Sequence, residues 1–146
     1  MNNLNIRKAA AKDKKRIKGI FRAEYAKFPW NEKWTEELAT KRINNYLNYE
    51  KVFVLEIDKK VQGFFILSSY VWHTGLRGFI HEIVISSEFQ GKGYGKKLIN
   101  FVEEYFKKKG ARDVQLITSP KSIAYQIYKK LNYKDEGFLT MYKELK

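Results

Sequence analysis

The chain has 146 residues, of which 44% are hydrophobic and 16% aromatic, enough for the core of one domain spanning 1–146. It has no cysteine, which excludes disulfides and a thiol nucleophile, and its two histidines, His73 and His81, leave little for a metal site. The net charge of +13 comes from 23 lysines and 6 arginines against 16 acidic residues. Because arginine is the usual residue for phosphate and base recognition, we interpret the lysine excess as a solvated surface. Without a signal-like start or an 18-residue apolar run, we expect a cytoplasmic protein with no membrane segment and no metal.

Hydrophobic periodicity and turn residues divide the chain into strands and helices. Alternating or uniformly apolar runs indicate strands, and apolar residues three and four positions apart indicate helices. Asp13 and Thr35 are candidate N-caps of the first two helices, and Gly110 is a candidate stop for the third. The expected order is a strand at 4–7, a helix at 11–27, a helix after Thr35 with Trp34, Leu38, Ile43 and Leu47 on one face, strands at 52–57, 64–67 and 79–85, a helix at 96–109, a strand at 114–118, a helix at 123–131, and strands at 133–135 and 139–145.

Three segments in this order carry particular expectations. Residues 58–60 are expected to turn the chain between two strands of a hairpin. Residues 70–78 are interpreted as a loop with aromatic side chains and two glycines. The run 79–85 is apolar on both faces in its second half, as in a central strand covered on both sides. The resulting order, β-α-α-β-β-β-α-β-α-β-β, predicts a mixed α/β sheet covered by helices.

Three alternating glycines lie between the strand 79–85 and the helix that follows it. Gly91, Gly93 and Gly95 allow the backbone to curl so that several N–H groups point to one spot, and the start of a helix adds partial positive charge there. Lys92, Lys96 and Lys97 add formal charge. The arrangement favours a pyrophosphate site, while a glycine-rich turn without a ligand is the structural alternative.

The spacing of this loop distinguishes among phosphate-binding motifs. A Walker loop needs a Ser or Thr after the lysine, where this chain has Lys97, and a dinucleotide fingerprint needs one more residue before its last glycine. The pattern Gln90-x-x-Gly93-x-Gly95 resembles the acetyl-CoA pyrophosphate loop of the GNAT superfamily of N-acetyltransferases, Q/R-x-x-G-x-G/A.

A second segment, 124–133 together with position 121 before it, resembles the GNAT pattern N-x-x-A-x-x-L-Y-x-x-L-G-F. It departs from that pattern at Lys121, Asn132 and Tyr133, where Asn, Gly and Phe are usual. Asn132 can adopt the left-handed conformation that ends a helix, whereas Lys121 removes an asparagine hydrogen bond to CoA. The order of elements also matches, so the resemblance covers nearly the whole chain and implies a mostly antiparallel sheet that splays between its fourth and fifth strands.

The resemblance assigns the co-substrate and the acid. It implies acetyl-CoA, with the pantetheine arm paired to the main chain of Ile83, Val84 and Ile85 like an added strand. It implies that the family's tyrosine, matched by Tyr128, protonates the departing CoA thiolate; packing in the core is the alternative role. The residues that the resemblance places around the pyrophosphate are Gln90, Gly91, Lys92, Gly93, Tyr94, Gly95 and Lys96.

Glu82 is the candidate general base. A carboxylate in so apolar a strand is costly unless it faces a cleft, where it would attract an ammonium and take its proton. A structural ion pair with lysine is the alternative. His81 is the rival base, but strand alternation predicts that its side chain points to the face opposite Glu82.

The acceptor is the least specified part of the reaction. The resemblance places two segments with aromatic side chains on the acceptor side of the site. The first contains Tyr25, Phe28, Trp30 and Trp34, and the second contains Tyr70, Trp72 and His73. Of these residues, Phe28, Trp30 and Trp72 are the candidate acceptor contacts. Such rings would hold a cationic amine or pack the core. A basic first helix disfavours a polyamine and suits an acceptor that carries an anionic group.

Three functions therefore compete, and a GNAT fold that binds CoA without turnover is a fourth alternative, against which the presence of Tyr128 speaks. The first is acetyl transfer from acetyl-CoA to a small primary amine, and the second is the same transfer to a protein N-terminus or lysine. The third is a nucleic-acid-binding module, whose only support is the charge, because no recognition helix or RNA-binding aromatic signature is present. Many GNAT members form dimers, so a homodimer is a further candidate partner, although no surface stripe in the sequence marks an interface.

Overall fold

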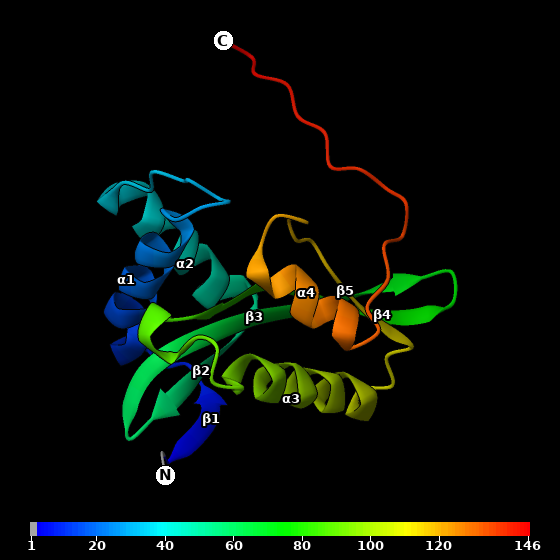
Figure 1. The fold of residues 1–146 in the computed structure, drawn as a ribbon, viewed down its shortest axis with the longest axis horizontal. Helices are drawn as coiled ribbons and strands as arrows, with labels where there is room; N and C mark the ends of the chain where they lie inside the picture. The colour runs from blue at the N-terminus through cyan, green and yellow to red at the C-terminus, as the bar shows by residue number, and fades with distance from the viewer. Residues whose placement is uncertain (1–2) are drawn as a thin grey trace.

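Five strands form one sheet, and helices cover both of its faces (Figure 1). This computed structural model describes residues 3–146. The elements are β1 (Leu4–Lys8), the short 3₁₀ helix η1 (Ala11–Asp13), α1 (Lys14–Tyr25), α2 (Glu36–Tyr49), β2 (Lys51–Ile57), β3 (Lys60–Trp72), β4 (Gly75–Ile85), the 3₁₀ helix η2 (Ser87–Phe89), α3 (Tyr94–Lys108), β5 (Asp113–Leu116) and α4 (Ile123–Lys130).

The strands pair in chain order, β1-β2-β3-β4-β5, and all pairs are antiparallel except β4 with β5. The parallel pair is joined through α3, as a parallel connection requires. It extends only from Arg77 with Asp113 to Ile80 with Leu116. Within the described chain, residues 81–85 of β4 therefore run past the end of β5 without a strand on that side. The expected mixed sheet that splays between its fourth and fifth strands is confirmed.

Each face of the sheet has its own hydrophobic core. Helices α1 and α2 cover one face and α3 and α4 the other (Figure 1). Along β2 and β3 successive side chains enter opposite cores, which is why these strands are apolar throughout: Val54 and Phe64 pack toward α1 and α2, whereas Phe53 and Phe65 stack on the α3 side with ring centroids 5.0 Å apart.

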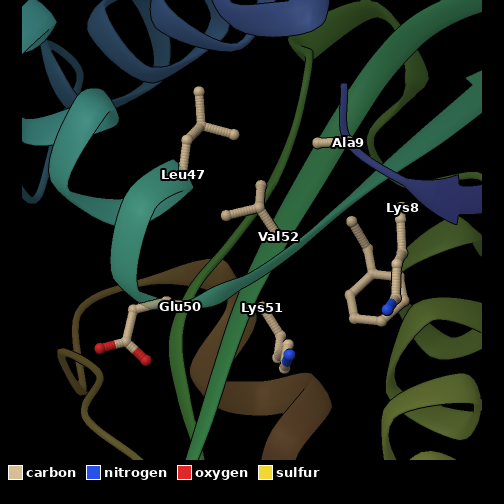
Figure 2. Close-up of a pocket in the computed structure, with 7 residues that line it drawn as sticks. Lys8, Ala9, Leu47, Glu50, Lys51 and Val52 are labelled. Carbon is tan, nitrogen blue, oxygen red and sulfur yellow. The ribbon is translucent and has the colours of Figure 1, made fainter. Parts of the chain in front are cut away.

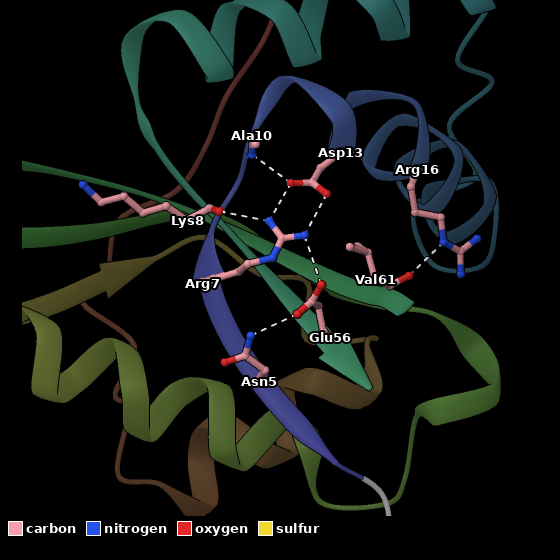
Figure 3. Close-up of polar contacts among 8 residues, drawn as sticks. All are labelled: Asn5, Arg7, Lys8, Ala10, Asp13, Arg16, Glu56 and Val61. Atoms are coloured by element: carbon pink, nitrogen blue, oxygen red, sulfur yellow. Dashed lines mark hydrogen bonds and ion pairs between the residues drawn. The ribbon is translucent and has the colours of Figure 1, made fainter. Parts of the chain in front are cut away.

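Asp13 is at the N-cap position of α1, as predicted, but its side chain makes no capping hydrogen bond to the helix and instead joins the start of α1 to the sheet. Its carboxylate accepts two hydrogen bonds from the Arg7 guanidinium, at 2.8 and 3.0 Å, and one from the backbone N–H of Ala10 at 2.7 Å (Figure 3). Arg7 also donates to Glu56 of β2 at 3.1 Å. The hydrogen bonds from Arg7 hold the pKa of the Asp13 carboxyl below its usual value, so the charged pair persists.

The second helix begins as predicted but buries a different face. Thr35 is its N-cap and accepts a hydrogen bond from the Leu38 N–H at 3.1 Å. Leu38 itself is 52% exposed, so its predicted place on the buried face is wrong. The buried residues are Ala39, Ile43 and Tyr46. The apolar pattern does not predict Tyr46, because its hydroxyl needs a polar partner even though its ring is apolar.

Most of residues 70–78 is strand, contrary to the predicted loop, and only His73 and Thr74 form a turn. Strand β3 continues to Trp72 and β4 begins at Gly75. Cross-strand contacts stabilise this end of the hairpin: Tyr70 pairs with Arg77, and the Arg77 guanidinium lies 5.3 Å from the Trp72 ring centroid. The hairpin predicted at 58–60 is confirmed, with Asp58 and Lys59 both in the left-handed region.

The two predicted C-terminal strands, at 133–135 and 139–145, are absent from the structure. Residues 131–146 contain no strand among the described elements, although the sequence alternates as a strand does. Alternation supplies the side chains for a strand, but a strand also needs a neighbour to satisfy its N–H and C=O groups, and here the segment runs away from the sheet (Figure 1).

Gly78 lets β4 approach α3, and its replacement tests this packing. A Cβ at Gly78 would lie 2.6 Å from the Phe106 ring, so Gly78→Ala is expected to lower the free energy of unfolding by about 1–3 kcal/mol. Gly19→Ala is the control, because a Cβ there meets nothing within 4 Å and alanine should stabilise α1 by about 1 kcal/mol. Urea unfolding measures both. Equal stability of the two variants would contradict the close contact.

Candidate active site

The glycine loop forms an open cradle in front of α3. Gly91 and Gly93 have φ of +74° and +89°, a region that suits glycine, and Gly93 is the N-cap of α3 without a side-chain cap. A Cβ at either glycine would meet nothing within 4 Å, so the space before the loop is open. Helix α3 begins at Tyr94, two residues before the predicted Lys96, which brings Gly95 into its first turn.

Positive charge surrounds this cradle. The amides of Gly95 and Lys96 lie in the first turn of α3, where a helix offers them no acceptor of its own. Lys92 and Lys97 lie over the rings of Phe89 and Tyr94, at 5.4 and 5.8 Å, so their charges stay beside the loop. Open space, outward-pointing amides and lysine charge fit a pyrophosphate.

The Gln90 side chain connects the glycine loop to β4 and α1 by hydrogen bonds. Its amide nitrogen donates to the Ile85 carbonyl at 2.6 Å and to the Glu24 carboxylate at 2.8 Å. Glu24 belongs to α1 and also accepts from the backbone N–H of Ser87 at 3.2 Å. Gln90 therefore positions the loop from the side. Sequence reasoning missed Glu24, because nothing in its helix marks a contact 66 residues away.

Glu82 lies in β4 and is held from α1 and α2. It accepts hydrogen bonds from the hydroxyls of Tyr25 and Tyr46, the latter at 2.7 Å, and Arg42 approaches it at 3.6 Å. Burial, and then the charge of Glu82, raise the pKa of both phenols, so they remain donors. The carboxylate side chain is 11% exposed, which makes it accessible yet oriented.

A β-bulge sits next to Glu82. Ile66 of β3 pairs with Glu82 and Leu67 pairs with Ile80, so His81 is an extra residue without a partner on β3. A bulge interrupts side-chain alternation and redirects side chains, and bulges are common beside active sites.

The bulge brings His81 to the same helix that holds Glu82. The His81 ring lies 5.7 Å from the Tyr46 ring, between centroids, and the Tyr46 hydroxyl donates to Glu82. The predicted separation of the two side chains onto opposite faces is therefore wrong. His81 Nε2 lies 2.7 Å from Ser68 Oγ and 3.8 Å from Glu50, and burial lowers its pKa, which favours the neutral ring.

Tyr128 projects from α4 into the core on the α3 side. Its side chain is buried, and burial raises the pKa of Tyr128 to about 12. Its hydroxyl has no hydrogen-bond partner among residues 3–146, and no sealed side-chain oxygen or nitrogen in this part of the chain lacks one. The hydroxyl therefore reaches accessible space. Ser122 caps α4 by accepting from the Tyr125 N–H, and Asn132 ends it with φ of +68°, as expected.

Tyr128 packs in the core on the α3 side of the sheet, whereas the Glu82 cluster is formed with α1 and α2. Burial, then Glu82 and to a smaller extent Tyr128 raise the pKa of the Tyr25 phenol, whose hydroxyl donates to Glu82. The stretch of β4 without a β5 partner, residues 81–85, contains Glu82 and leads to the glycine loop. The arrangement thus offers a free strand edge that carries a carboxylate.

The predicted acceptor aromatics divide between two places. Trp30 contacts the Tyr25 ring at 5.7 Å, beside the Glu82 cluster, and Phe28 is 71% exposed on the same loop. Trp72 lies at the tip of the β3–β4 hairpin, seven β4 residues from Glu82, or about 20 Å along the strand. The structure therefore does not bring Trp72 to Glu82.

Two surface hollows lie away from this site. One of about 180 Å³ lies between β1, α2 and β2 (Figure 2), and another of about 240 Å³ lies between α2, β3 and α3. Neither borders Glu82 or Tyr128. The candidate site is therefore defined by its strand edge and its side chains.

No helix in the described chain has the length and apolar character needed to cross a membrane.

The fold is that of an acyltransferase. The chain matches the Acetyltransferase (GNAT) family over residues 15–133. It belongs to this family. It is 30% identical over 140 residues to the uncharacterized N-acetyltransferase MJ1207 of Methanocaldococcus jannaschii; that match covers 90% of this chain but only 59% of the relative.

Two solved structures share the fold. A possible acetyltransferase from Clostridium difficile 630 superposes with a TM-score of 0.83 at 18% identity, covering 97% of both chains. Aminoglycoside N-acetyltransferase AAC(6')-Iy in complex with CoA superposes with a TM-score of 0.77 at 19% identity, covering 99% of this chain and 97% of that one.

Proposed function

We propose that this acetyltransferase moves an acetyl group from acetyl-CoA to the primary amine of a small molecule by direct attack in a ternary complex. One observation carries the proposal: an edge of β4 without a β5 partner runs from Glu82 to the open glycine loop before α3. Acetyl-CoA would supply a thioester whose carbonyl carbon accepts the amine.

The residues around the edge fit the co-substrate. The amides between Gly91 and Lys96, with the α3 N-terminus and neighbouring lysines, would hold the pyrophosphate. The main chain of Ile83, Val84 and Ile85 has N–H and C=O groups along an edge where β5 has ended, so it can pair with the pantetheine amides as a strand would. A β4 N–H beside the thioester carbonyl would stabilise negative charge on its oxygen.

The reaction needs two proton transfers, one from the amine to Glu82 and one from Tyr128 to the thiolate. Glu82 attracts the ammonium form of the acceptor and takes its proton, directly or through one water, while Tyr25 and Tyr46 keep the carboxylate oriented. Tyr128 donates its proton to the departing thiolate, which its unpartnered, protonated hydroxyl is able to do.

The charges around the site limit the chemical class of the acceptor. Glu82 favours a cationic amine, and the exposed Phe28 and the Trp30 beside Tyr25 would cover it. Arg42 lies 3.6 Å from Glu82, so a second, anionic group on the acceptor would find a partner there. The solved relative in complex with CoA acts on aminoglycosides, as its name states, which supports a small-molecule amine over a protein.

Thermal unfolding with acetyl-CoA tests the proposal. A ligand at about 100 times its Kd stabilises by about 2.7 kcal/mol, so the Tm should rise by about 5–10 °C, whereas ATP and NAD should have little effect. Gly93→Ala should abolish most of the shift. Gly110→Ala is the matched control, since it imposes the same backbone strain at φ of +80° away from the loop. No shift for the unmodified chain at saturating acetyl-CoA would overturn the proposal.

A further inference from the structure

Arg42 of α2 is used differently from most arginines of this chain. Arginine is scarce here, with 6 residues against 23 lysines. Four of the six guanidinium groups donate hydrogen bonds to other residues of the described chain, and these belong to Arg7, Arg16, Arg22 and Arg77. Arg42 instead approaches Glu82 at 3.6 Å, which is an ion pair longer than a hydrogen bond. Its side chain is 48% exposed, so part of its five-donor fork faces solvent.

The Tyr46 side chain orients this guanidinium as well as the Glu82 carboxylate. Arg42 and Tyr46 are four residues apart on α2 and therefore lie on one face of the helix. The guanidinium carbon lies 4.9 Å from the centroid of the Tyr46 ring, and the Tyr46 hydroxyl donates to Glu82 at 2.7 Å. One tyrosine thus holds the cation through its ring and the anion through its hydroxyl. A charge pair fixed in this way is arranged for a ligand before the ligand binds.

The spacing of the two charges limits the shape of the acceptor. An ammonium on Glu82 and an anion on Arg42 would each lie about 2.8 Å from the protein group that binds it. Since those two protein groups are only 3.6 Å apart, the ammonium and the anion are close neighbours in the acceptor. In an α-amino acid two bonds separate the nitrogen from the carboxylate carbon, a distance of about 2.5 Å. An amine whose anionic group lies many bonds away would have to fold back on itself.

We infer that the acceptor is a free α-amino acid, with its ammonium on Glu82 and its carboxylate on Arg42; this inference rests on the proposed function. The planar fork of arginine fits a carboxylate through two parallel N–H···O bonds. The transfer breaks the thioester C–S bond and forms the C–N bond of an N-acetyl amino acid. Of the two protons that the ammonium loses, Glu82 takes one, and the other balances the proton that Tyr128 gives to the thiolate.

The side chain of the amino acid would meet the loop between α1 and α2. Arg42 approaches Glu82 from α2, whereas this loop reaches Glu82 through Tyr25, whose hydroxyl donates to the carboxylate. Trp30 of the loop lies 5.7 Å from the Tyr25 ring, between centroids, and Phe28 is 71% exposed. Aromatic rings at this position favour an apolar side chain.

Thiol release from acetyl-CoA tests the inference with three amino acids, L-phenylalanine, L-leucine and L-methionine, each beside its amide. The amide keeps the amine and the side chain but has no carboxylate, as in a peptide N-terminus. We expect kcat/KM for the amino acid to exceed that for its amide by at least about 30-fold, since the charge-assisted bonds to Arg42 are lost. The amine of the amide is less protonated at neutral pH, so amine basicity does not explain such a preference.

Two variants on α2 separate direct contact from overall charge. Arg42→Gln removes the fork, so the ratio of the two kcat/KM values should fall to about 1. Lys41→Gln removes the same charge from the next residue, which pairs with the exposed Glu37 at 3.2 Å, and the ratio should remain that of the unmodified chain. The Tm shift induced by acetyl-CoA checks that both variants fold and bind the co-substrate.

The outcomes separate this inference from the proposed function. A preference for the amino acids that is lost in Arg42→Gln and kept in Lys41→Gln supports the inference. Amides that react as fast as the amino acids overturn it and leave the proposed function intact. A preference that survives Arg42→Gln, or that both variants lose, overturns it as well, because the carboxylate is then bound elsewhere or sensed only at long range. A chain that binds acetyl-CoA but acetylates none of the six compounds also overturns it, whereas only the absence of acetyl-CoA binding overturns the proposed function.

Discussion

Tyr128→Phe is expected to lower kcat by at least about 100-fold while the affinity for acetyl-CoA stays nearly unchanged. General acid catalysis contributes about 10²–10⁴ in rate, and the variant removes only the proton that the hydroxyl supplies. The ring keeps its place in the core between α3 and α4, so the binding surface is preserved. Thiol release at saturating acetyl-CoA and amine measures kcat, and the ligand-induced Tm shift measures binding.

Tyr133→Phe is the matched control. The Tyr133 ring lies 5.7 Å from the Tyr128 ring, but its hydroxyl donates to Glu103 and so has a structural role. This variant should lose about 1 kcal/mol of stability and retain its kcat. If Tyr128→Phe turns over at the rate of the unmodified chain, Tyr128 is not the acid, and a water must protonate the thiolate.

The pH dependence gives a second measure of the role of Tyr128. Because an acid acts only in its protonated form and burial raises the pKa of Tyr128 to about 12, the hydroxyl remains protonated at least to about pH 11. The rate profile should therefore show no alkaline decline that belongs to Tyr128 between pH 8 and about pH 10. A decline in that window that Tyr128→Phe removes would contradict the raised pKa.

The parts of the site that lie close together in sequence were predictable. The strand 79–85, the glycine loop and α3 are consecutive, and each is specified by its own residue types: apolar side chains, glycines at positive φ and amphipathic spacing. Helix α4 with Tyr128 and its ending at Asn132 is equally local. Such features depend on neighbouring residues, which the sequence displays directly.

The parts that depend on tertiary contact were not predictable. The bulge at His81 arises from how β3 and β4 pair, and it reverses the expected separation of His81 from Glu82. Tyr25 and Tyr46 reach Glu82 from 57 and 36 residues away, and neither helix shows a pattern that marks a polar partner. The strand-like alternation at 139–145 is similar, because a sequence shows which side chains would suit a strand but not which edge is available to it.

Glu82→Gln is expected to lower kcat/KM by about 100-fold and to shift or abolish the acidic limb of the pH–rate profile, since that limb reports protonation of the base. Glutamine keeps the shape: its amide oxygen can accept from one of the Tyr25 and Tyr46 hydroxyls and its NH2 group can donate to the other, so the fold and acetyl-CoA binding should persist. It neither attracts the ammonium nor takes its proton. Glu50→Gln is the control, because Glu50 lies 3.8 Å from His81 and makes no contact with the proposed base. An unchanged acidic limb in Glu82→Gln, with a limb displaced in Glu50→Gln, would transfer the role of base to His81.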